Sequence, residues 1–230
     1  MKTSKRTARI VGVLFLAGTA AGLLSVVFTG SILDNPDYLI KVSANGNQLI
    51  IGALLVLIMG FTLAMVPVVL FPIFKKYNET LALGAVVFRG VLEAVAYIAI
   101  VICWLLLIAL SREYAAAGVL DTSYFQIPGT LLLEAADSVG LILSIVFSLG
   151  ALMIYYIFFQ SELIPRWLSV WGLIGAVVYL AEPLIAMFGT ELEILFAPLA
   201  LQEMVLALWL IVKGFNSSAT TSGHNASQGR

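Results

Sequence analysis

The sequence has very few of the side chains that carry most protein chemistry. Its 230 residues include one cysteine, Cys103, and one histidine, His224. A single cysteine cannot form an intramolecular disulfide or a paired redox site. A single histidine excludes multi-histidine haem ligation, the H-E-x-x-H zinc motif and most histidine-based triads. No phosphate-binding loop, dinucleotide fingerprint or G-x-S-x-G motif is present. The sequence therefore predicts no metal site, no cofactor and no catalytic residues.

Charged residues are also scarce, at 11% of the chain, and the net charge is -1. The basic residues are scattered, with no patch of interleaved aromatic residues, so nucleic acid is not an expected partner. Apolar residues make up 61% of the chain, whereas soluble domains contain roughly 45–50%. This composition indicates that the lipid bilayer is the main partner of the chain.

Six apolar runs are long enough to cross a bilayer, because a hydrocarbon core of about 30 Å requires roughly 20 helical residues. The runs cover residues 10–30, 48–73, 86–110, 130–158, 167–188 and 192–212. They predict an all-α fold, a polytopic transmembrane helical bundle of six helices over residues 10–213, with no soluble domain. Residues 1–9 form a basic N-terminal segment. Residues 214–230 are small and polar, which predicts a disordered tail.

The basic residues predict the orientation of this bundle, because lysine and arginine next to membrane helices are retained in the cytoplasm. If the N-terminus is inside, six crossings place nearly all flanking basic residues inside: Lys2, Lys5, Arg6, Arg9, Lys75, Lys76, Arg166 and Lys213. Only Lys41 and Arg112 are then outside. Both termini, and therefore the polar tail, are expected in the cytoplasm.

Two opposite charges stand near the start of the third apolar run. Arg89 and Glu93 are four residues apart, so they can meet on one face of a helix. Either the arginine extends to the headgroups at the cytoplasmic surface, or it pairs with Glu93 inside the bundle. The same face continues with Tyr97, Ile100 and Trp104, which either pack against neighbouring helices or line a polar cavity.

Four further acids lie within apolar runs, and with Glu93 they outnumber the one candidate cation, Arg89. They are Glu134, Asp137, Glu182 and Glu203. The acids cannot all be ion-paired, so some must be protonated, lie at the interface or border water. Ionisable groups inside membrane spans are functional-site hypotheses by default. These six residues are therefore the candidate ligand-binding or ion-pair residues, and Glu203, near the middle of its run, is the hardest to assign to the interface.

The face of the fourth run that begins at Asp137 continues with Ser144, Ser148 and Tyr155. Small hydroxyl residues on one helical face allow close packing and hydrogen bonds between helices. The alternative is a hydrophilic path that enters from the outer surface.

Several segments resemble one known family. They are "RIVGVLFLAGTAAGLL", "FRGVLE", "SELIPRWLSVWGLIGAVVYL" and "PLALQEMVLALWLIVKGFN". They are similar to a prokaryotic multipass membrane family catalogued as a domain of unknown function, numbered four-three-eight-six. The resemblance implies a helical bundle in a bacterial or archaeal plasma (inner) membrane, without a reaction or a substrate. It also implies that Arg89, Glu93 and Glu203 are important.

Three classes of function remain open from the sequence. A structural, sensory or assembly role agrees best with the lack of a cofactor or nucleophile motif. A proton-linked carrier or small-ligand-binding protein would use the intramembrane carboxylates. An intramembrane enzyme would need an acid pair, and the spacing of Glu134 and Asp137 suits a shared proton poorly. A carrier requires a hydrated pocket that reaches mid-membrane acids, whereas a structural bundle would pack these acids with partners. The sequence assigns no protein or small-molecule partner and no oligomeric state.

Overall fold

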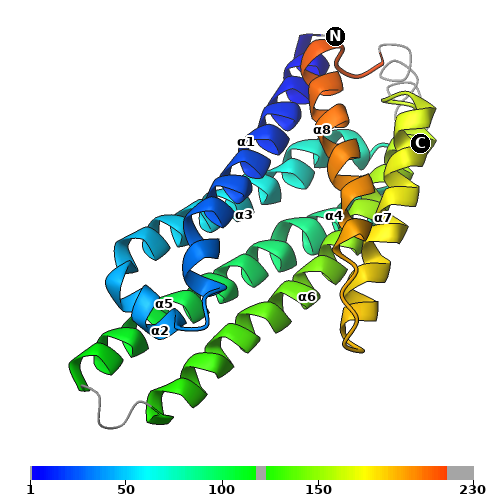
Figure 1. The fold of residues 1–230 in the computed structure, drawn as a ribbon. Coiled ribbons are helices and arrows are strands. Elements are labelled where there is room, and N and C mark those ends of the chain that lie inside the picture. The colour runs from blue at the N-terminus through cyan, green and yellow to red at the C-terminus, as the bar shows by residue number, and fades with distance from the viewer. Residues whose placement is uncertain (1, 118–122, 217–230) are drawn as a thin grey trace.

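The computed structural model describes residues 2–117 and 123–216, and within these ranges the chain is helical and contains no strands (Figure 1). The first three helices are α1 (Lys2–Leu33), α2 (Tyr38–Ala44) and α3 (Gly46–Phe74). The next crossing is continuous and consists of α4 (Glu79–Ala85), the π-helical segment η1 (Val86–Leu92) and α5 (Glu93–Ala117). The last elements are α6 (Ser123–Ser161), α7 (Arg166–Ala186), the 3₁₀ segment η2 (Glu193–Phe196) and α8 (Ala197–Val212).

Six helical stretches are long and apolar enough to cross a membrane, which confirms the predicted all-α bundle. They are Lys5–Leu33, Gly46–Phe74, Glu79–Ala117, Tyr124–Ser161, Arg166–Ala186 and Glu193–Val212. Large apolar side chains face outward along them, including Val26, Phe61 and Val177. Helices satisfy their backbone hydrogen bonds internally, so such surfaces are stable in contact with lipid. The chain is therefore a membrane protein.

The connections between the spans are more helical than the sequence suggested. The first link contains α2, and residues 111–117 and 123–129, expected in a loop, extend α5 and begin α6. The extension of α5 includes three alanines and a glutamate, which are good helix formers. Residues 2–9 continue α1. Of the predicted tail, residues 217–230 lie outside the described residues.

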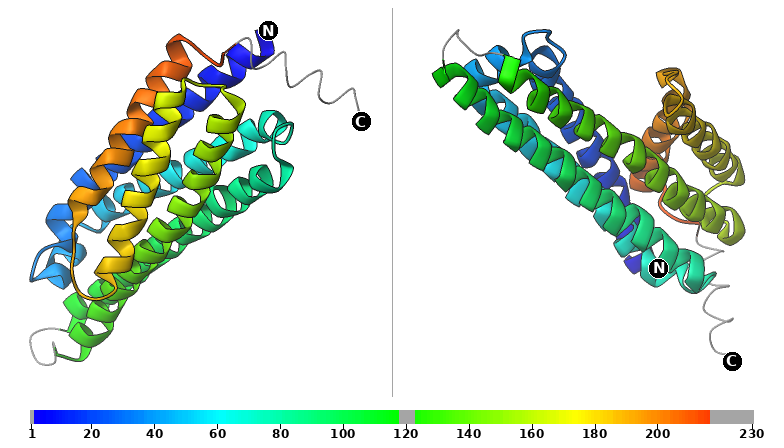
Figure 2. Two further views of the ribbon diagram at one scale, coloured as in Figure 1. Left: turned by 90° about the vertical axis from the view of Figure 1, so that its right-hand side faces the viewer. Right: turned by 90° about the horizontal axis from the view of Figure 1, so that it is seen from below.

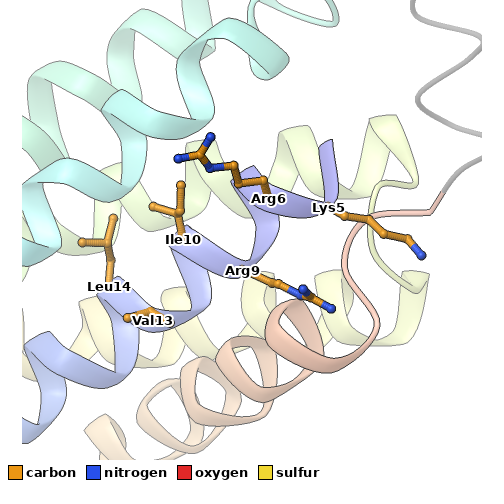
Figure 3. A pocket seen from close by; sticks show the side chains of 6 residues that line it. All are labelled: Lys5, Arg6, Arg9, Ile10, Val13 and Leu14. Carbon is orange, nitrogen blue, oxygen red and sulfur yellow. The ribbon is translucent and has the colours of Figure 1, made fainter. Parts of the chain in front are cut away.

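The bundle has one basic end and one acidic end. The basic end holds the start of α1, the links 75–78 and 162–165, and residues 213–216; its basic residues are Lys5, Arg6, Arg9, Lys75, Lys76, Arg166 and Lys213. Both ends of the described chain lie there (Figures 1 and 2). The acidic end holds α2 and the links after α5 and α7. At the basic end, Lys5, Arg6 and Arg9 lie beside a hollow of about 500 Å³, which continues along Ile10, Val13 and Leu14 (Figure 3).

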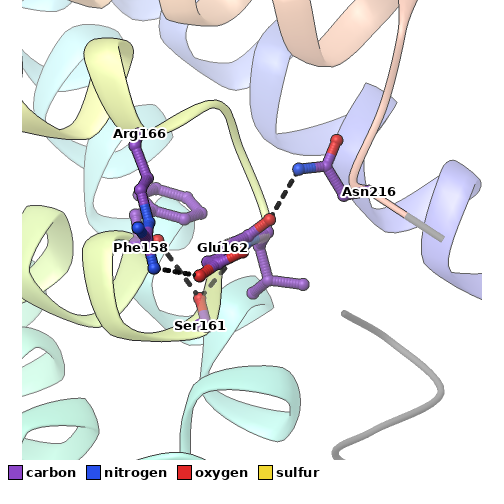
Figure 4. A network of polar contacts seen from close by, with 6 residues as sticks. Phe158, Ser161, Glu162, Arg166 and Asn216 are labelled. Atoms are coloured by element: carbon purple, nitrogen blue, oxygen red, sulfur yellow. Dashed lines mark hydrogen bonds and ion pairs between the residues drawn. The ribbon is translucent and has the colours of Figure 1, made fainter. Parts of the chain in front are cut away.

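The turn between α6 and α7 binds the last described residues to the basic end. Helix α6 ends at Ser161 because Glu162 adopts a left-handed backbone conformation, with φ 51°. The Glu162 carboxylate pairs with Arg166, and its carbonyl accepts a hydrogen bond of 2.6 Å from the Asn216 side chain (Figure 4). Phe215 is 5% exposed. Residues 214–216, which the sequence assigned to the disordered tail, therefore pack onto the bundle.

Helices α1 and α8 touch at the basic end and diverge toward the acidic end (Figure 1). A Cβ atom added at Gly12 of α1 would lie only 2.6 Å from the Ala207 carbonyl oxygen of α8. Toward the acidic end α1 packs instead on α3, where added Cβ atoms at Gly18 and Gly22 would meet Leu63 and Met59. The small residues of α1 thus serve packing within the chain.

Gly150 allows α6 to approach the π-helical segment η1. A Cβ atom there would lie 2.9 Å from the backbone nitrogen of Arg89 and 2.8 Å from its Cβ. Backbone atoms cannot move away as a flexible side chain can, so no larger residue fits at this position.

Gly150→Ala is therefore expected to lower the free energy of unfolding by about 1–3 kcal/mol, the usual cost of overpacking. The matched control is Gly140→Ala in the same helix, because a Cβ atom at Gly140 meets nothing within 4 Å. Thermal unfolding of both variants in detergent provides the measurement. Equal stability of the two variants would show that α6 and η1 are not in close contact.

Candidate functional site

Arg89 lies inside the bundle rather than at the membrane surface. Its side chain is 1% exposed and that of Glu93 is 0% exposed. Of the two alternatives left open by the sequence, extension to the headgroups is wrong and pairing inside the bundle is correct. The physical reason is that α8 supplies a second carboxylate, Glu203, in direct contact with the guanidinium group.

The ion cluster, which consists of Arg89, Glu93 and Glu203, joins three segments. Arg89 Nη2 lies 2.9 Å from Glu203 Oε1, and Arg89 Nε lies 3.9 Å from Glu93 Oε2. The guanidinium carbon also lies 4.1 Å from the centre of the Phe147 ring in α6 and 5.6 Å from that of Phe15 in α1. Aromatic faces attract cations, most strongly where water is absent. Five segments therefore contribute to holding one charge.

The backbone around Arg89 is adapted to this position. Arg89 lies in η1, where the helix widens to a π-helical turn before α5 begins at Glu93. Such turns are rare and are often found at functional sites. Gly150 permits the close approach of α6 described above. No sequence pattern indicated the π-helical turn.

The ion cluster is incompletely neutralised by its own side chains. One guanidinium faces two carboxyl groups, so the cluster carries a net negative charge when both acids are ionised. The contact between Arg89 and Glu203 has the distance of an ion pair but not the angles of a hydrogen bond. Among the described residues, neither Arg89 Nη1 nor either oxygen of Glu93 has a hydrogen-bond partner. Buried polar atoms without partners are uncommon, and a neutral cluster requires one further positive charge, such as a proton.

A cavity of about 760 Å³, the vestibule, lies between the helices toward the acidic end. The side chains that matter for its chemistry are Asp34, Asp137, Glu182, Glu191 and Glu193, the hydroxyls Ser25, Thr29 and Ser144, and the aromatic residues Trp104 and Phe196. Its lining extends inward to Met59 and Ser144, each near the middle of its helix. No lysine, arginine or histidine is among its lining residues in the part of the chain that the structure describes.

Glu182 is the most buried acid of the vestibule. It is 3% exposed and lies near the end of α7. The backbone amide of Leu192 lies against its carboxylate, but Oε2 has no hydrogen-bond partner among the described residues. A buried carboxylate oxygen without a donor is costly unless a cation or a proton reaches it.

The six candidate residues thus divide into two groups and one outlier. Arg89, Glu93 and Glu203 form the ion cluster, whereas Asp137 and Glu182 line the vestibule. Glu134 is exposed and is not among the described lining residues, although it is only three positions from Asp137. The face of α6 with Ser144, Ser148 and Tyr155 is buried, but Ser148 donates to the carbonyl of Ser144 in its own helix, 2.7 Å away.

Several residues of the ion cluster and of the vestibule were not predicted from the sequence. Phe15 and Phe147 looked like ordinary apolar residues, and their contact with the cation depends on the tertiary structure. Asp34, Glu191 and Glu193 lie in links or at a helix end, where acids usually contact water. The only available signal was the excess of acids over basic residues in these links.

The family model described as Domain of unknown function (DUF4386) matches residues 10–214, nearly all of the described chain. The chain therefore belongs to this family, as its helix-end segments suggested. Comparisons with curated proteins and with solved structures find no match. The family description assigns no reaction and no ligand.

Coupling between Arg89 and Glu203 can be measured with a double-mutant cycle. Arg89→Gln leaves two buried acids without their cation, and removal of one partner of a buried pair costs about 3–5 kcal/mol. Combining it with Glu203→Gln is expected to recover much of this loss. Arg89→Lys is also expected to be destabilising, because a lysine cannot contact two carboxylates and two rings with a planar group.

The control is the exposed pair of Glu162 and Arg166, whose side chains are 55% and 69% exposed. Arg166→Gln is expected to change the free energy of unfolding by no more than about 1 kcal/mol. The free energy of unfolding of every variant is measured in detergent. If the effects of Arg89→Gln and Glu203→Gln add within about 0.5 kcal/mol, the two residues do not interact.

Proposed function

We propose that this chain is a small-ligand-binding protein of a prokaryotic plasma membrane, and that the vestibule is its binding site. The observation that carries the proposal is the vestibule itself, a cavity of about 760 Å³ that reaches Met59 and Ser144. Pockets of roughly 300–1,000 Å³ with a few polar groups among apolar side chains are typical of small-molecule sites. Binding between the helices of a bundle is also typical of membrane carriers.

The distribution of basic residues supports an orientation with the vestibule open to the outside. Seven flanking basic residues whose side chains the structure describes lie at the basic end, and in the described part of the acidic end the only basic residues are Lys41 and Arg112. Since flanking lysine and arginine remain in the cytoplasm, the basic end and both termini are cytoplasmic in this proposal. A ligand then enters the vestibule from outside the cell.

A structural, sensory or assembly role is the second candidate, and the ion cluster favours it. Glu93 and Glu203 contact Arg89, and neither is among the described lining residues of the vestibule. Acids that pack with a partner behave as expected of a structural bundle. The two roles are compatible, because the acids that line the vestibule, Asp137 and Glu182, are different residues. An enzyme is the least supported candidate, because Glu134 is not among the described residues that line the vestibule beside Asp137.

Water access to the vestibule can be tested at Gly140, which lines it and has open space around its Cβ position. In a Cys103→Ser background, Gly140→Cys should react with a membrane-impermeant thiol reagent added outside intact cells, because thiolates form only where water is present. The extent of labelling is read by mass spectrometry. Labelling from the cytoplasmic side alone would contradict the proposed orientation of the vestibule.

Two positions in α7 serve as controls for this experiment. Val177→Cys faces outward, since Val177 is 58% exposed and apolar, and it should react slowly because lipid surrounds it. Ala176→Cys is fully buried and should not react. A reaction at Gly140→Cys no faster than at Val177→Cys would show that lipid fills the vestibule.

The orientation has its own test. Two reporters are fused to the C-terminus in turn. The one that functions only in the cytoplasm should be active, and the one that functions only outside should be inactive, because six crossings return the chain to its starting side. The reverse pattern of activity would show that the basic end faces outward.

A further inference from the structure

We propose that the ligand of the vestibule is a small organic cation, which carries a protonated amine or a quaternary ammonium group next to an apolar body. This inference rests on the proposed function, because it names the chemical class that the same site would accept. Three features of the vestibule carry it: the sign of its charge, the unpartnered oxygen of Glu182 and its aromatic side chains.

The charge of the vestibule is negative throughout its described lining. Five carboxylates contribute to it, and the basic residues of the acidic end are absent from that lining. Arg112 lines a separate hollow with residues 43–48. A cleft of one charge with low-dielectric walls concentrates counter-ions. The vestibule therefore attracts cations and repels anions.

Glu182 provides a specific anchor within this field. It is 97% buried, it lines the vestibule, and Oε2 has no hydrogen-bond partner in the described chain. Oε2 itself is enclosed, so a turn of the Glu182 side chain toward the vestibule would bring it to an ammonium group, which would donate a hydrogen bond to it. Hydrogen bonds between charged groups are about twice as strong as neutral ones. Four less buried acids near the mouth, Asp34, Asp137, Glu191 and Glu193, would guide the cation inward.

Size and aromatic content favour an organic cation over a metal ion. No group of three or more metal-ligating side chains occurs among the described residues, so the five carboxylates are too dispersed to coordinate one ion. The cavity holds far more than a single ion. Trp104 and Phe196 also line it, and aromatic faces are frequent binding surfaces for ammonium groups. Apolar side chains such as Val56, Met59 and Leu141 would contact the body of the ligand.

The test uses the Gly140→Cys, Cys103→Ser protein in intact vesicles and measures the rate of thiol labelling by a neutral reagent. Benzyltrimethylammonium is the probe. It is compared with its neutral analogue neopentylbenzene, with the anion benzenesulfonate, with calcium and with sodium chloride. The cation is expected to slow labelling several-fold in a saturable manner, while the neutral analogue, the anion and the salts leave the rate nearly unchanged.

Variants identify the anchor. Glu182→Gln should raise the half-protecting concentration of the cation at least about tenfold, because a charged hydrogen-bond acceptor is lost. Asp137→Asn, at an exposed position of the vestibule, should raise it less and provides a second reading if Glu182→Gln does not fold. Glu134→Gln is the matched control in the same helix and should have no effect, since Glu134 is not among the described lining residues.

The possible outcomes separate the inference from the function on which it rests. If Gly140→Cys is not labelled from outside, the proposed function fails. If it is labelled but the neutral analogue protects as well as the cation, the vestibule binds apolar molecules or lipid and the inference fails. Protection by calcium alone would indicate a metal site and would also overturn it. Equal protection of the parent protein and both acid variants by the cation would also overturn the inference.

Discussion

Burial of one guanidinium charge among six membrane helices is the constraint on which the rest of the structure depends. An isolated charge in this environment is strongly unfavourable, so the fold must bring compensating groups to Arg89. Glu203 of α8 and the ring of Phe147 of α6 lie directly against it, and Glu93 lies one turn further along the same crossing. The close approach also requires that Gly150 have no side chain. The contacts of a single cation therefore join α5, α6 and α8.

The ion cluster and the vestibule solve the same problem of intramembrane acids in different ways. Glu93 and Glu203 share the single cation Arg89 within closely packed helices. Asp137 and Glu182 have no basic side chain beside them among the described lining residues, and they border a cavity instead. The cavity lies toward the acidic end, where residues of α1, α3, α5, α6 and α7 line it, whereas α1 and α8 touch at the basic end. In the proposed function, a bundle that is packed closely at one end and open at the other would bind its ligand without losing this packing.

The spans were predictable from the sequence because bilayer thickness sets their length, and apolar composition is a local property. Pairing of Arg89 with Glu93 was also accessible, since residues four apart share a helical face. The contact with Glu203 was not, because more than a hundred residues separate the partners and sequence does not reveal the order of helices. Glu134 and Asp137 show the same limit: three residues apart, they have different surroundings, because helix rotation is set by neighbouring helices. The π-helical turn at Val86–Leu92 has no recognisable signal in the local sequence.

The distance between the guanidinium nitrogens of Arg89 and the carboxyl carbon of Glu203 tests this account most directly. It can be measured by solid-state NMR in lipid bilayers, on protein with nitrogen-labelled arginine and carbon-labelled glutamate. Comparison with the spectrum of the Glu203→Gln variant assigns the signal. The account predicts a strong dipolar coupling, in agreement with the 2.9 Å contact between Nη2 and Oε1, that disappears in the variant. A guanidinium signal coupled to lipid phosphate and not to a glutamate carboxyl carbon would place Arg89 at the membrane surface and contradict the account.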